Sequence, residues 1–298
     1  MAELGGTRSG FVALAGRPNV GKSTLVNAMV GRKVAIVSDK PQTTRRAIRG
    51  VATRDDVQIV LCDLPGVQRP RDELTRRMQH RVEHELGEAD AALFVVNGDQ
   101  GVGGPGDVWI ANALRGAAVP VVIAVNKVDR TSNARTVEAL QAAADLGLDA
   151  EVFPVSARTG RGVADLVDHL AGLLPQGPFY FPVEEVSDQP DSVLLAELVR
   201  EQVLARTRQE LPHAVEVQLE ELEQRGDILH VRALVWVETE SQKGIVIGSG
   251  GRMIKAIGSA ARRELERELG AHVHLDLSVR VRRAWRADDA LLDRLGIT

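Results

Sequence analysis

A glycine-rich segment, GRPNVGKS at 16–23, has the residue types and spacing of a phosphate-binding loop. An apolar run, FVALA, precedes it and a helical pattern follows it, which is the context that this motif requires. Backbone N–H groups at the start of such a helix can surround the α and β phosphates of a nucleotide. Lys22 is expected to reach the β and γ phosphates as the catalytic cation, and Ser23 is expected to bind Mg²⁺ directly. The predicted contacts are Gly16, Arg17, Pro18, Asn19, Val20, Gly21, Lys22, Ser23 and Thr24.

A second motif, DLPG at 63–66, ends another apolar run. An aspartate at the carboxyl end of a parallel strand beside the phosphate loop is placed to hold Mg²⁺ through a water molecule. The N–H of Gly66 would contact the γ phosphate, with Leu64 and Pro65 between it and Asp63. Because Asp-x-Pro-Gly is also a common turn, this motif has weight only in combination with the others.

Two further motifs, NKVD at 126–129 and SAR at 156–158, bear on the choice of base. The Asp129 carboxylate can accept hydrogen bonds from N1–H and N2–H₂ of guanine together, whereas adenine would leave it buried and unpaired. A buried carboxylate left without its hydrogen-bond donors can disfavour an adenine nucleotide relative to a guanine nucleotide by a factor of about 10⁴. Asn126 is expected to brace the base and the phosphate loop, and the Lys127 stem to cover the ring. The four motifs predict a guanine-nucleotide site whose base contacts are Asn126, Lys127, Val128, Asp129, Ser156, Ala157 and Arg158, the last three through backbone N–H groups to guanine O6.

The segment SDKPQTTRRAIRG at 38–50 lies between the first two motifs. A threonine here can complete the Mg²⁺ shell only when a γ phosphate is present, so we expect the segment to order with GTP as switch I. Thr43 and Thr44 both qualify, and Thr44 is favoured as the direct Mg²⁺ ligand. A solvated basic loop is the alternative for the two arginines. The predicted switch residues are Gln42, Thr43, Thr44, Arg45 and Arg46.

Val67 directly follows the DLPG motif, where many GTPases carry a glutamine that orients the attacking water. A valine side chain cannot form a hydrogen bond with water. Hydrolysis of GTP to GDP and phosphate must therefore be organised without this side chain, and we expect it to be slow without help.

The elements that would hold these motifs are continuous apolar runs alternating with helical patterns, from residue 11 to about 175. Continuous runs are typical of parallel strands covered on both faces. The alternation predicts an α/β fold with a doubly wound, mostly parallel sheet. The predicted strands are FVALAG, VQIVLCD, ALFVVN, VPVVIAVN and EVFPVSA.

A proline-rich stretch at 175–192 interrupts this alternation of apolar runs and helical patterns, and it predicts a linker. An amphipathic helix pattern follows, and then the runs AVEVQLEEL, ILHVRALVWV and VHLDLSVRV alternate apolar and polar residues. Such alternation predicts a sheet with one open face in a separate α+β domain. We therefore expect a GTPase domain at 1–175, a linker at 176–192 and a second domain at 193–298.

The second domain contains a G-x-x-G turn, Gly248 to Gly251, followed by a helical pattern. A KH domain clamps the backbone of single-stranded RNA with such a loop, because glycines let ribose-phosphate approach the main chain. Segment 243–286 carries ten Lys and Arg residues against four acidic ones, a local charge of +6, as expected for a nucleic-acid surface. The predicted RNA contacts are Lys243, Gly248, Ser249, Gly250, Gly251, Arg252, Lys255, Arg282 and Arg283.

Composition limits the remaining possibilities. The 298 residues, 44% of them hydrophobic, suffice for two domains with their own cores. The single cysteine, Cys62, lies in a predicted buried strand, which favours a packing role in a reducing compartment. The N-terminus lacks the pattern of a signal peptide, and no apolar run reaches the roughly 18–20 residues that span a bilayer. We expect a cytosolic protein whose membrane association, if any, is peripheral.

The motifs together resemble the Era family of bacterial GTPases, from about residue 10 to the C-terminus. The resemblance rests on GRPNVGKSTLVNAMVG, KPQTTRR, DLPGV, NKVD, SDQP, SQKGIVIGSGGRMIKAIG and RRAWRADDALLDRLG. It implies a Ras-like G domain followed by a type II KH domain, and we expect the protein to be a monomer. It also implies binding to the 3′ end of 16S ribosomal RNA during 30S maturation, with peripheral association at the inner face of the cell membrane.

Three positions refine the resemblance. Val67 matches the family's hydrophobic substitution for the catalytic glutamine. Asn19 matches the asparagine of GTPases that use K⁺ at the phosphates, so K⁺ dependence is a hypothesis. Ser249 stands where the family usually has a lysine, which leaves the backbone clamp intact but removes one positive charge.

Alternative interpretations belong to other classes. A metabolic P-loop enzyme such as a kinase conflicts with the NKVD motif. A ribosome-associated RNA-binding protein of another GTPase family is the second alternative. A structural RNA-binding protein that does not hydrolyse GTP is the third, and the intact Lys22, Ser23 and Asp63 argue against it.

Overall fold

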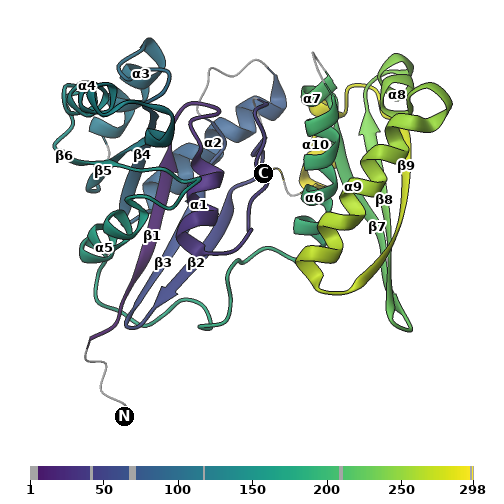
Figure 1. The fold of residues 1–298 in the computed structure, drawn as a ribbon, viewed down its shortest axis with the longest axis horizontal. Helices are drawn as coiled ribbons and strands as arrows, with labels where there is room; N and C mark the ends of the chain where they lie inside the picture. The colour runs from purple at the N-terminus through teal and green to yellow at the C-terminus, as the bar shows by residue number, and fades with distance from the viewer. Residues whose placement is uncertain are drawn as a thin grey trace.

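Two layered units lie side by side, connected by a segment that crosses beneath them in the view of Figure 1. The structure is a computed structural model, and it describes residues 6–40, 43–66, 72–116, 118–207, 211–295 and 297. We call the part from β1 to α5 the first unit and the part from α6 to the C-terminus the second unit. The division predicted from the sequence, at 175 and 192, stays a prediction.

The first unit is built on a six-stranded sheet with the order β2-β3-β1-β4-β5-β6. All neighbouring strands are parallel except β2, which pairs antiparallel with β3. The prediction of a doubly wound, mostly parallel sheet is confirmed. The strands are β1 (Arg8–Ala15), β2 (Ile48–Arg54), β3 (Val57–Asp63), β4 (Ala91–Asn97), β5 (Val121–Asn126) and β6 (Ala150–Pro154).

Strand β2 is not among the predicted strands, and its residues 48–50 lie in the segment 38–50 that the sequence predicts as a switch. Its sequence, IRGVATR, mixes polar and apolar residues because it is an edge strand. A two-residue turn at Asp55 and Asp56 joins it to β3, with Asp55 in the left-handed region (φ 44°). Such turns are usually marked by glycine or asparagine, so this hairpin carries only a weak sequence signal.

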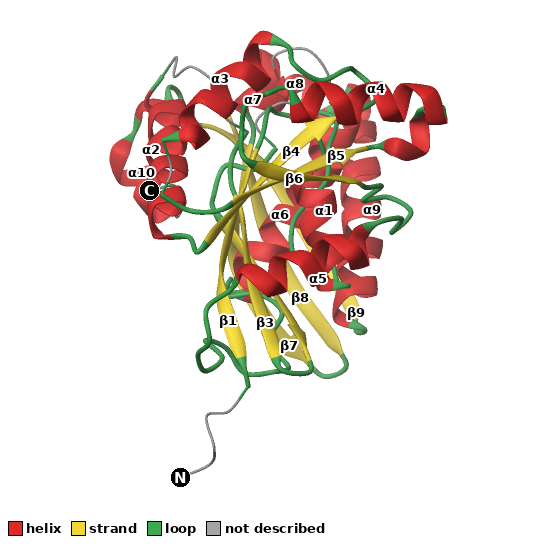
Figure 2. Ribbon diagram, turned by 90° about the vertical axis from the view of Figure 1, so that its left-hand side faces the viewer, coloured by secondary structure: helices red, strands yellow, loops and turns green. Residues whose placement is uncertain are grey.

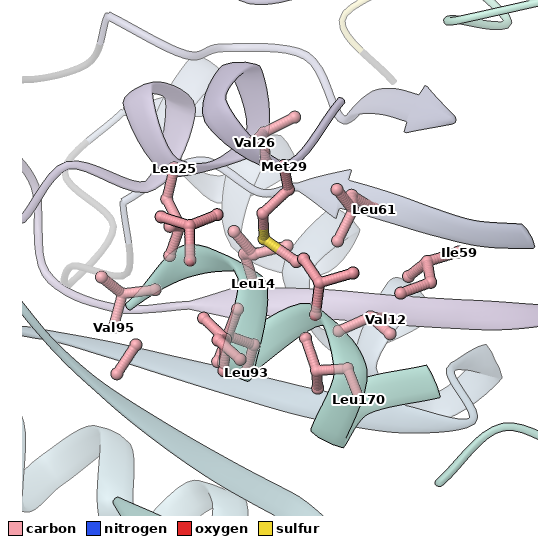
Figure 3. Close-up of a cluster of buried hydrophobic side chains, with 14 of the residues drawn as sticks. Val12, Leu14, Leu25, Val26, Met29, Ile59, Leu61, Leu93, Val95 and Leu170 are labelled. Atoms are coloured by element: carbon pink, nitrogen blue, oxygen red, sulfur yellow. The ribbon is translucent and has the colours of Figure 1, made fainter. Parts of the chain in front are cut away.

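In the part of the first unit that the structure describes, helices α1 to α5 cover the two faces of this sheet. Side chains of α1 and α5 pack on one face, and those of α2, α3 and α4 on the other. Figure 3 shows Leu25, Val26 and Met29 of α1 directed at the strands, and Leu170 of α5 next to Val12 of β1. Each such side chain contributes about 1.5–3 kcal/mol when fully buried. The helices are α1 (Lys22–Val30), α2 (Glu73–Glu88), α3 (Pro105–Arg115), α4 (Asn133–Ala144) and α5 (Val163–Leu173), with a 3-10 turn at Val128–Arg130.

The second unit has a three-stranded sheet, β7-β8-β9, with α6 and α9 packed on one face. Val231, Ala233, Val235 and Val237 of β8 point into this core and are buried, as the alternation predicted, while Leu229 is half-buried. The elements are α6 (Asp191–Arg206), α7 (Leu211–Ala214), β7 (Glu216–Arg225), β8 (Ile228–Val237), α8 (Glu240–Ile247), η2 (Ser249–Gly251), α9 (Arg252–Leu269), β9 (His272–Val281), η3 (Trp285–Ala287) and α10 (Asp289–Arg294).

The proline-rich connection is attached to the first unit. Gln58 of β3 is fully buried, and its Oε1 accepts hydrogen bonds from the N–H groups of Tyr180 and Phe181, both at 2.9 Å. Further along, the N–H of Val51 donates to the Val186 carbonyl at 2.8 Å. Since a bridge also joins Gly50 and Ser187, only residues 188–190 lie between the attached segment and α6.

The two units also meet through α2 and the C-terminal residues, and α2 and α10 lie next to each other in Figure 2. Arg286 forms an ion pair with Asp72, which also caps α2 by accepting from the Thr75 N–H at 2.9 Å. The apolar part of this contact consists of Leu74, Met78, Trp285, Leu291, Leu292, Leu295 and Ile297.

None of the helices in the described part of the chain combines the length and the apolar composition that a membrane span requires.

Cys62 is predicted to be unreactive in the native protein. Its side chain is fully buried in β3, and burial, together with the neighbouring Glu85 carboxylate, raises the pKa of the thiol. Because the thiolate is the nucleophile, native protein should not react with DTNB, while protein unfolded in guanidinium should release one equivalent of thiol. Rapid reaction of the native protein would contradict the packing role.

Candidate functional site

The phosphate loop connects β1 to α1, and its glycines are required by crowding as well as by backbone angle. A Cβ on Gly16 (φ 157°) would lie 2.5 Å from the Val95 carbonyl oxygen, and one on Gly21 (φ 101°) would lie 2.4 Å from Asn126 Nδ2. Helix α1 begins at Lys22 without a side-chain cap. Its first N–H groups are therefore available to an anion, as phosphate binding at a helix N-terminus requires.

Lys22 lies at the base of this loop and is only 6% exposed. Its ammonium donates to the carbonyls of Gly16 (3.0 Å) and Arg17 (3.3 Å). Burial lowers the pKa of Lys22 to about 8, and the nearby Asp63 carboxylate opposes this effect. A phosphate oxygen at the loop would supply the missing counter-charge and raise this pKa again. The Arg17 side chain instead points to α3, where Nε donates to Asp107 Oδ1 at 2.6 Å.

Three oxygen-bearing side chains predicted to bind Mg²⁺ converge at the carboxyl end of β3. Ser23 Oγ lies 3.0 Å from Thr44 Oγ1, and Thr44 Oγ1 lies 3.4 Å from Asp63 Oδ2. Asp63 Oδ1 is buried without a hydrogen-bond partner. Burial raises the pKa of Asp63, and Lys22 opposes this shift. A buried carboxylate oxygen without a partner, next to two hydroxyls, fits the oxygen ligands that Mg²⁺ prefers.

The geometry favours Thr44 over Thr43 as the Mg²⁺ ligand. The Thr43 hydroxyl donates to the Lys40 carbonyl at 2.6 Å, so it is directed away from Ser23 and Asp63. The structure describes only some of the other predicted switch residues. Gln42 lies outside the described residues, whereas Arg45 and Arg46 contact the second unit. A solvated loop is therefore wrong for these two arginines, because Arg45 is 2% exposed and both form ion pairs.

The DLPG motif lies against the phosphate loop. A Cβ on Gly66 would lie 2.8 Å from Pro18 Cγ and 2.9 Å from its backbone nitrogen, so only glycine fits here without displacing the loop. Leu64 and Pro65 are buried. Val67 lies outside the described residues, and its role in hydrolysis stays a prediction.

Asn126 connects three of the predicted motifs and is 2% exposed. Its Nδ2 donates to the Val20 carbonyl at 2.9 Å, and its Oδ1 accepts from the N–H groups of Lys127 (2.8 Å) and Ala157 (3.0 Å). The Lys127 ammonium extends over the loop and donates to the Asn19 carbonyl at 2.7 Å. Asn126 therefore fixes the base-binding motifs relative to the phosphate loop.

The Asp129 carboxylate lies at the rim of a pocket that adjoins the phosphate loop. Its Oδ1 accepts from Ser156 Oγ at 2.7 Å, and this hydrogen bond is the main reason why the pKa of Asp129 is lowered. Arg158 lies 3.6 Å from Oδ2. Val37 and Gln100 also line this pocket, and the sequence did not identify them because they belong to no motif. Asp129 is thus held ionised and in position to accept hydrogen bonds from a base.

The second predicted site begins at the G-x-x-G turn between α8 and α9. Gly250 and Gly251 have left-handed angles (φ 60° and 76°), and a Cβ on either would meet no atom within 4 Å. Their main chain is therefore open to solvent. Gly248 differs, because a Cβ there would lie 2.7 Å from Met253 Cβ. Arg252 begins α9, and its Nε donates back to the Ser249 carbonyl at 3.3 Å.

A groove beside this turn runs between α9 and β9, and Lys255 is the one predicted RNA contact that lines it. Lys243 is on α8, and Arg283 is exposed beyond β9. Arg282 pairs with Asp288 at 2.5 Å and lies over Trp236. The groove residues that the sequence missed are Ile254, Gly258, Ser259, Arg262, His274, Leu275 and Leu277. Those on α9 repeat every three to four positions along one side of the helix, next to the face that packs in the core, and this spacing could have identified them.

Two protein-family models match the chain. A model described as a 50S ribosome-binding GTPase matches residues 11–127, and a KH domain model matches residues 210–286. The first covers the phosphate loop, the DLPG motif and the start of NKVD, and the second covers the G-x-x-G turn and the groove. The chain is also similar to proteins of known identity along almost its whole length.

The GTPase Era of Mycobacterium avium (strain 104) is 47% identical over 295 residues, covering 97% of this chain and 98% of the relative. That of Mycobacterium tuberculosis (strain ATCC 25177 / H37Ra) gives the same values. Among solved structures, Era in complex with MgGDPNP and nucleotides 1506–1542 of 16S ribosomal RNA has a TM-score of 0.94 and 34% identity, covering 98% of this chain and 100% of that one. A variant of Aquifex aeolicus Era bound to GDP and AlF₄⁻ has a TM-score of 0.93, 33% identity and the same coverage.

Replacing Asp129→Asn should abolish most of the affinity for GTP. The asparagine amide is neutral, and its one carbonyl oxygen can accept from only one of the two guanine donors, while its NH₂ group faces the other donor. Both hydrogen bonds to a charged group are thus lost and at most one neutral hydrogen bond replaces them, so the affinity should fall about 10²- to 10⁴-fold. Competition with a fluorescent GTP analogue measures this loss. Ser156→Ala is the control, because it removes the hydrogen bond at 2.7 Å but keeps the carboxylate, and it should cost about tenfold or less. Equal GTP affinity in Asp129→Asn and the parent protein would contradict the assignment.

Proposed function

The chain belongs to the family of the GTPase Era, and from this premise we propose that it is a GTP-operated RNA-binding switch that binds the 3′ end of 16S ribosomal RNA and assists maturation of the 30S subunit. The observation that carries the proposal is the presence, in one chain, of a guanine-type pocket and an open G-x-x-G turn beside a groove. The Era relative solved with 16S nucleotides, at 34% identity over 98% of this chain, supports the same RNA.

At the nucleotide, the residues of this chain would bind and orient rather than react. Lys22 and the first N–H groups of α1 would stabilise charge on the β and γ phosphates. Ser23 and Thr44 would hold Mg²⁺ directly and Asp63 through water. The ion, when bound, neutralises charge on the phosphate oxygens. Since the Val67 side chain offers no hydrogen bond to water, we propose that hydrolysis by this chain alone is slow.

At the RNA, the sugar-phosphate backbone would approach the exposed main chain of Gly250 and Gly251. The bases of the same strand would then lie in the groove, over Ile254 and Leu275, with the polar groups of Ser259 at its edge. Single-stranded RNA is recognised in this way because its unpaired bases can turn outward into such a groove. Cytoplasmic location, peripheral membrane association and a monomeric state stay predictions.

A K⁺ ion at the phosphates is a further part of the proposal. Asn19 has a left-handed backbone (φ 64°), and its Nδ2 donates to the Asp39 carbonyl at 2.8 Å. This hydrogen bond uses the amide nitrogen, so the side-chain oxygen is the atom that would contact an alkali cation, for which amide and carbonyl oxygens are suitable ligands.

RNA binding should depend on the charge at position 249. Ser249→Lys restores a cation next to the RNA backbone, so it should tighten binding and steepen the dependence of log Kd on log salt by about 0.7. Ser249→Asp should weaken binding about tenfold by repulsion. Fluorescence anisotropy with the 3′-terminal segment of 16S RNA measures both, and GTP affinity is the control, because Ser249 does not line the nucleotide pocket. Equal affinity for this RNA and a scrambled one would contradict the proposed target.

GTP hydrolysis should be several-fold faster in KCl than in NaCl at equal ionic strength, because K⁺ would add positive charge beside the transferring phosphate. Phosphate release under multiple turnover measures the rates. Asn19→Gly accepts the left-handed backbone but lacks the side-chain oxygen, so it should respond equally to the two salts. Equal rates in the parent protein would refute K⁺ dependence.

A further inference from the structure

The second unit contributes directly to the environment of switch I. We propose that Arg200 on α6 and Glu216 on β7 are positioning residues for the GTPase reaction: they hold residues 43–46 so that Thr44 can bind Mg²⁺ when GTP is present. The inference rests on the proposed function, because it takes Thr44 as a ligand of the nucleotide-bound ion.

Arg200 acts on the residue before Thr44. Its guanidinium is fully buried, and Nη2 donates to the Thr43 carbonyl. The Glu197 carboxylate fixes this side chain by accepting from Nε at 3.0 Å and from Nη2 at 2.6 Å. Burial by itself would lower the pKa of Arg200, but Glu197 and Glu216 together raise it, so the guanidinium remains charged. A main-chain carbonyl of switch I is thus bound by a rigid cation from the other unit.

Glu216 acts on the two residues after Thr44. Its Oε2 accepts from Arg45 Nη1 at 2.7 Å, in an ion pair whose side chains are both fully buried. Arg45 also donates to the carbonyls of Val215 (2.6 Å) and His213 (3.1 Å), and its guanidinium lies over Trp285. The other carboxylate oxygen of Glu216 accepts from Arg46 at 3.2 Å. Burial by itself would raise the pKa of Glu216, but Arg46, Arg45 and Arg200 together lower it below its usual value, so the carboxylate remains ionised at neutral pH.

Thr44 is therefore held from both sides along the chain. Its neighbour Thr43 is bound to α6, and its neighbours Arg45 and Arg46 are bound to β7 and α6. The short distances from Thr44 Oγ1 to Ser23 and Asp63 exist within this frame. A buried ion pair contributes little net stability when compared with apolar packing, so its effect here is to define position. Each neighbour of Thr44 is bound by the second unit, whereas the threonine itself faces the nucleotide site.

The test separates binding of GTP from binding of GDP, because Thr44 contacts the ion only when a γ phosphate is present. Arg200→Met keeps the buried stem but removes the donor to Thr43, and Glu197 remains paired with Arg46 at 2.7 Å. We expect the affinity for GTPγS with Mg²⁺ to fall about tenfold and the affinity for GDP to change less than twofold. Arg200→Lys, which keeps a cation near Thr43, should recover most of the loss. Hydrogen exchange at residues 43–47 should rise in Arg200→Met.

Arg77→Met is the matched control. Arg77 also joins the two units, through Asp289 (2.7 Å) and Asp293 (2.6 Å), but it makes these contacts from α2 to α10 and not to switch I. The ratio of GTPγS to GDP affinity should therefore stay at its parental value. Arg46→Gln, whose side chain is 11% exposed, provides a second measurement of the same ratio if Arg200→Met does not fold.

The outcomes are distinguishable. A parental ratio of GTPγS to GDP affinity in both Arg200→Met and Arg46→Gln, or an equal fall for both nucleotides, would overturn the positioning role. An equal change of the ratio in Arg77→Met would overturn it as well, since any loosening of the two units would then suffice. Failure of the parent protein to bind GTP would instead refute the nucleotide site itself.

Discussion

A buried ion pair between Arg45 and Glu216 constrains how the two units of this protein meet. Both side chains are fully buried, so neither charge has water as an alternative partner within the contact. Separating the units would leave two charges to be rehydrated or paired again, and breaking one partner of such a pair is strongly destabilising. The residues beside it, Thr44 and Trp285, belong to the nucleotide site and to the C-terminal contact. The same few contacts thus relate the GTP site to the rest of the chain.

The remaining connections between the units restrict how they can move. The proline-rich segment is hydrogen-bonded to the first unit as far as Ser187, which leaves residues 188–190 before α6. Lys33, from the first unit, pairs with Glu201 of α6 and with Glu264 of α9, both at 2.6 Å. Helix α9 also lines the groove proposed for RNA. A conformational change in switch I and a conformational change at the groove would therefore both alter the contact between the two units. Such shared contacts make any coupling between the two ligands reciprocal.

Features that depend on a local sequence pattern could be predicted from the sequence. Features that depend on contacts between residues far apart in the chain could not. Asp63 and Asn126 end strands with clear apolar runs, and Lys22 follows such a strand through the phosphate loop. The structure brings all three to the carboxyl ends of the parallel strands. The burial of Arg45 could not be predicted, because an arginine is buried only when a partner such as Glu216, 171 positions away, is brought to it. Strand β2 and the docking of the linker on Gln58 depend in the same way on distant partners.

The two glycine-rich loops of this chain both expose main chain to a phosphate group, but glycine is needed in them for different reasons. At Gly16 and Gly21, a side chain would collide with the protein itself, at Val95 and Asn126, so these glycines are required by the packing of the loop. At Gly250 and Gly251 the protein leaves open space, and only the left-handed backbone favours glycine. A phosphate in the first loop is therefore surrounded by a closely packed cradle that suits one small ligand. The second loop presents an open main chain, which suits a strand that continues beyond it in both directions.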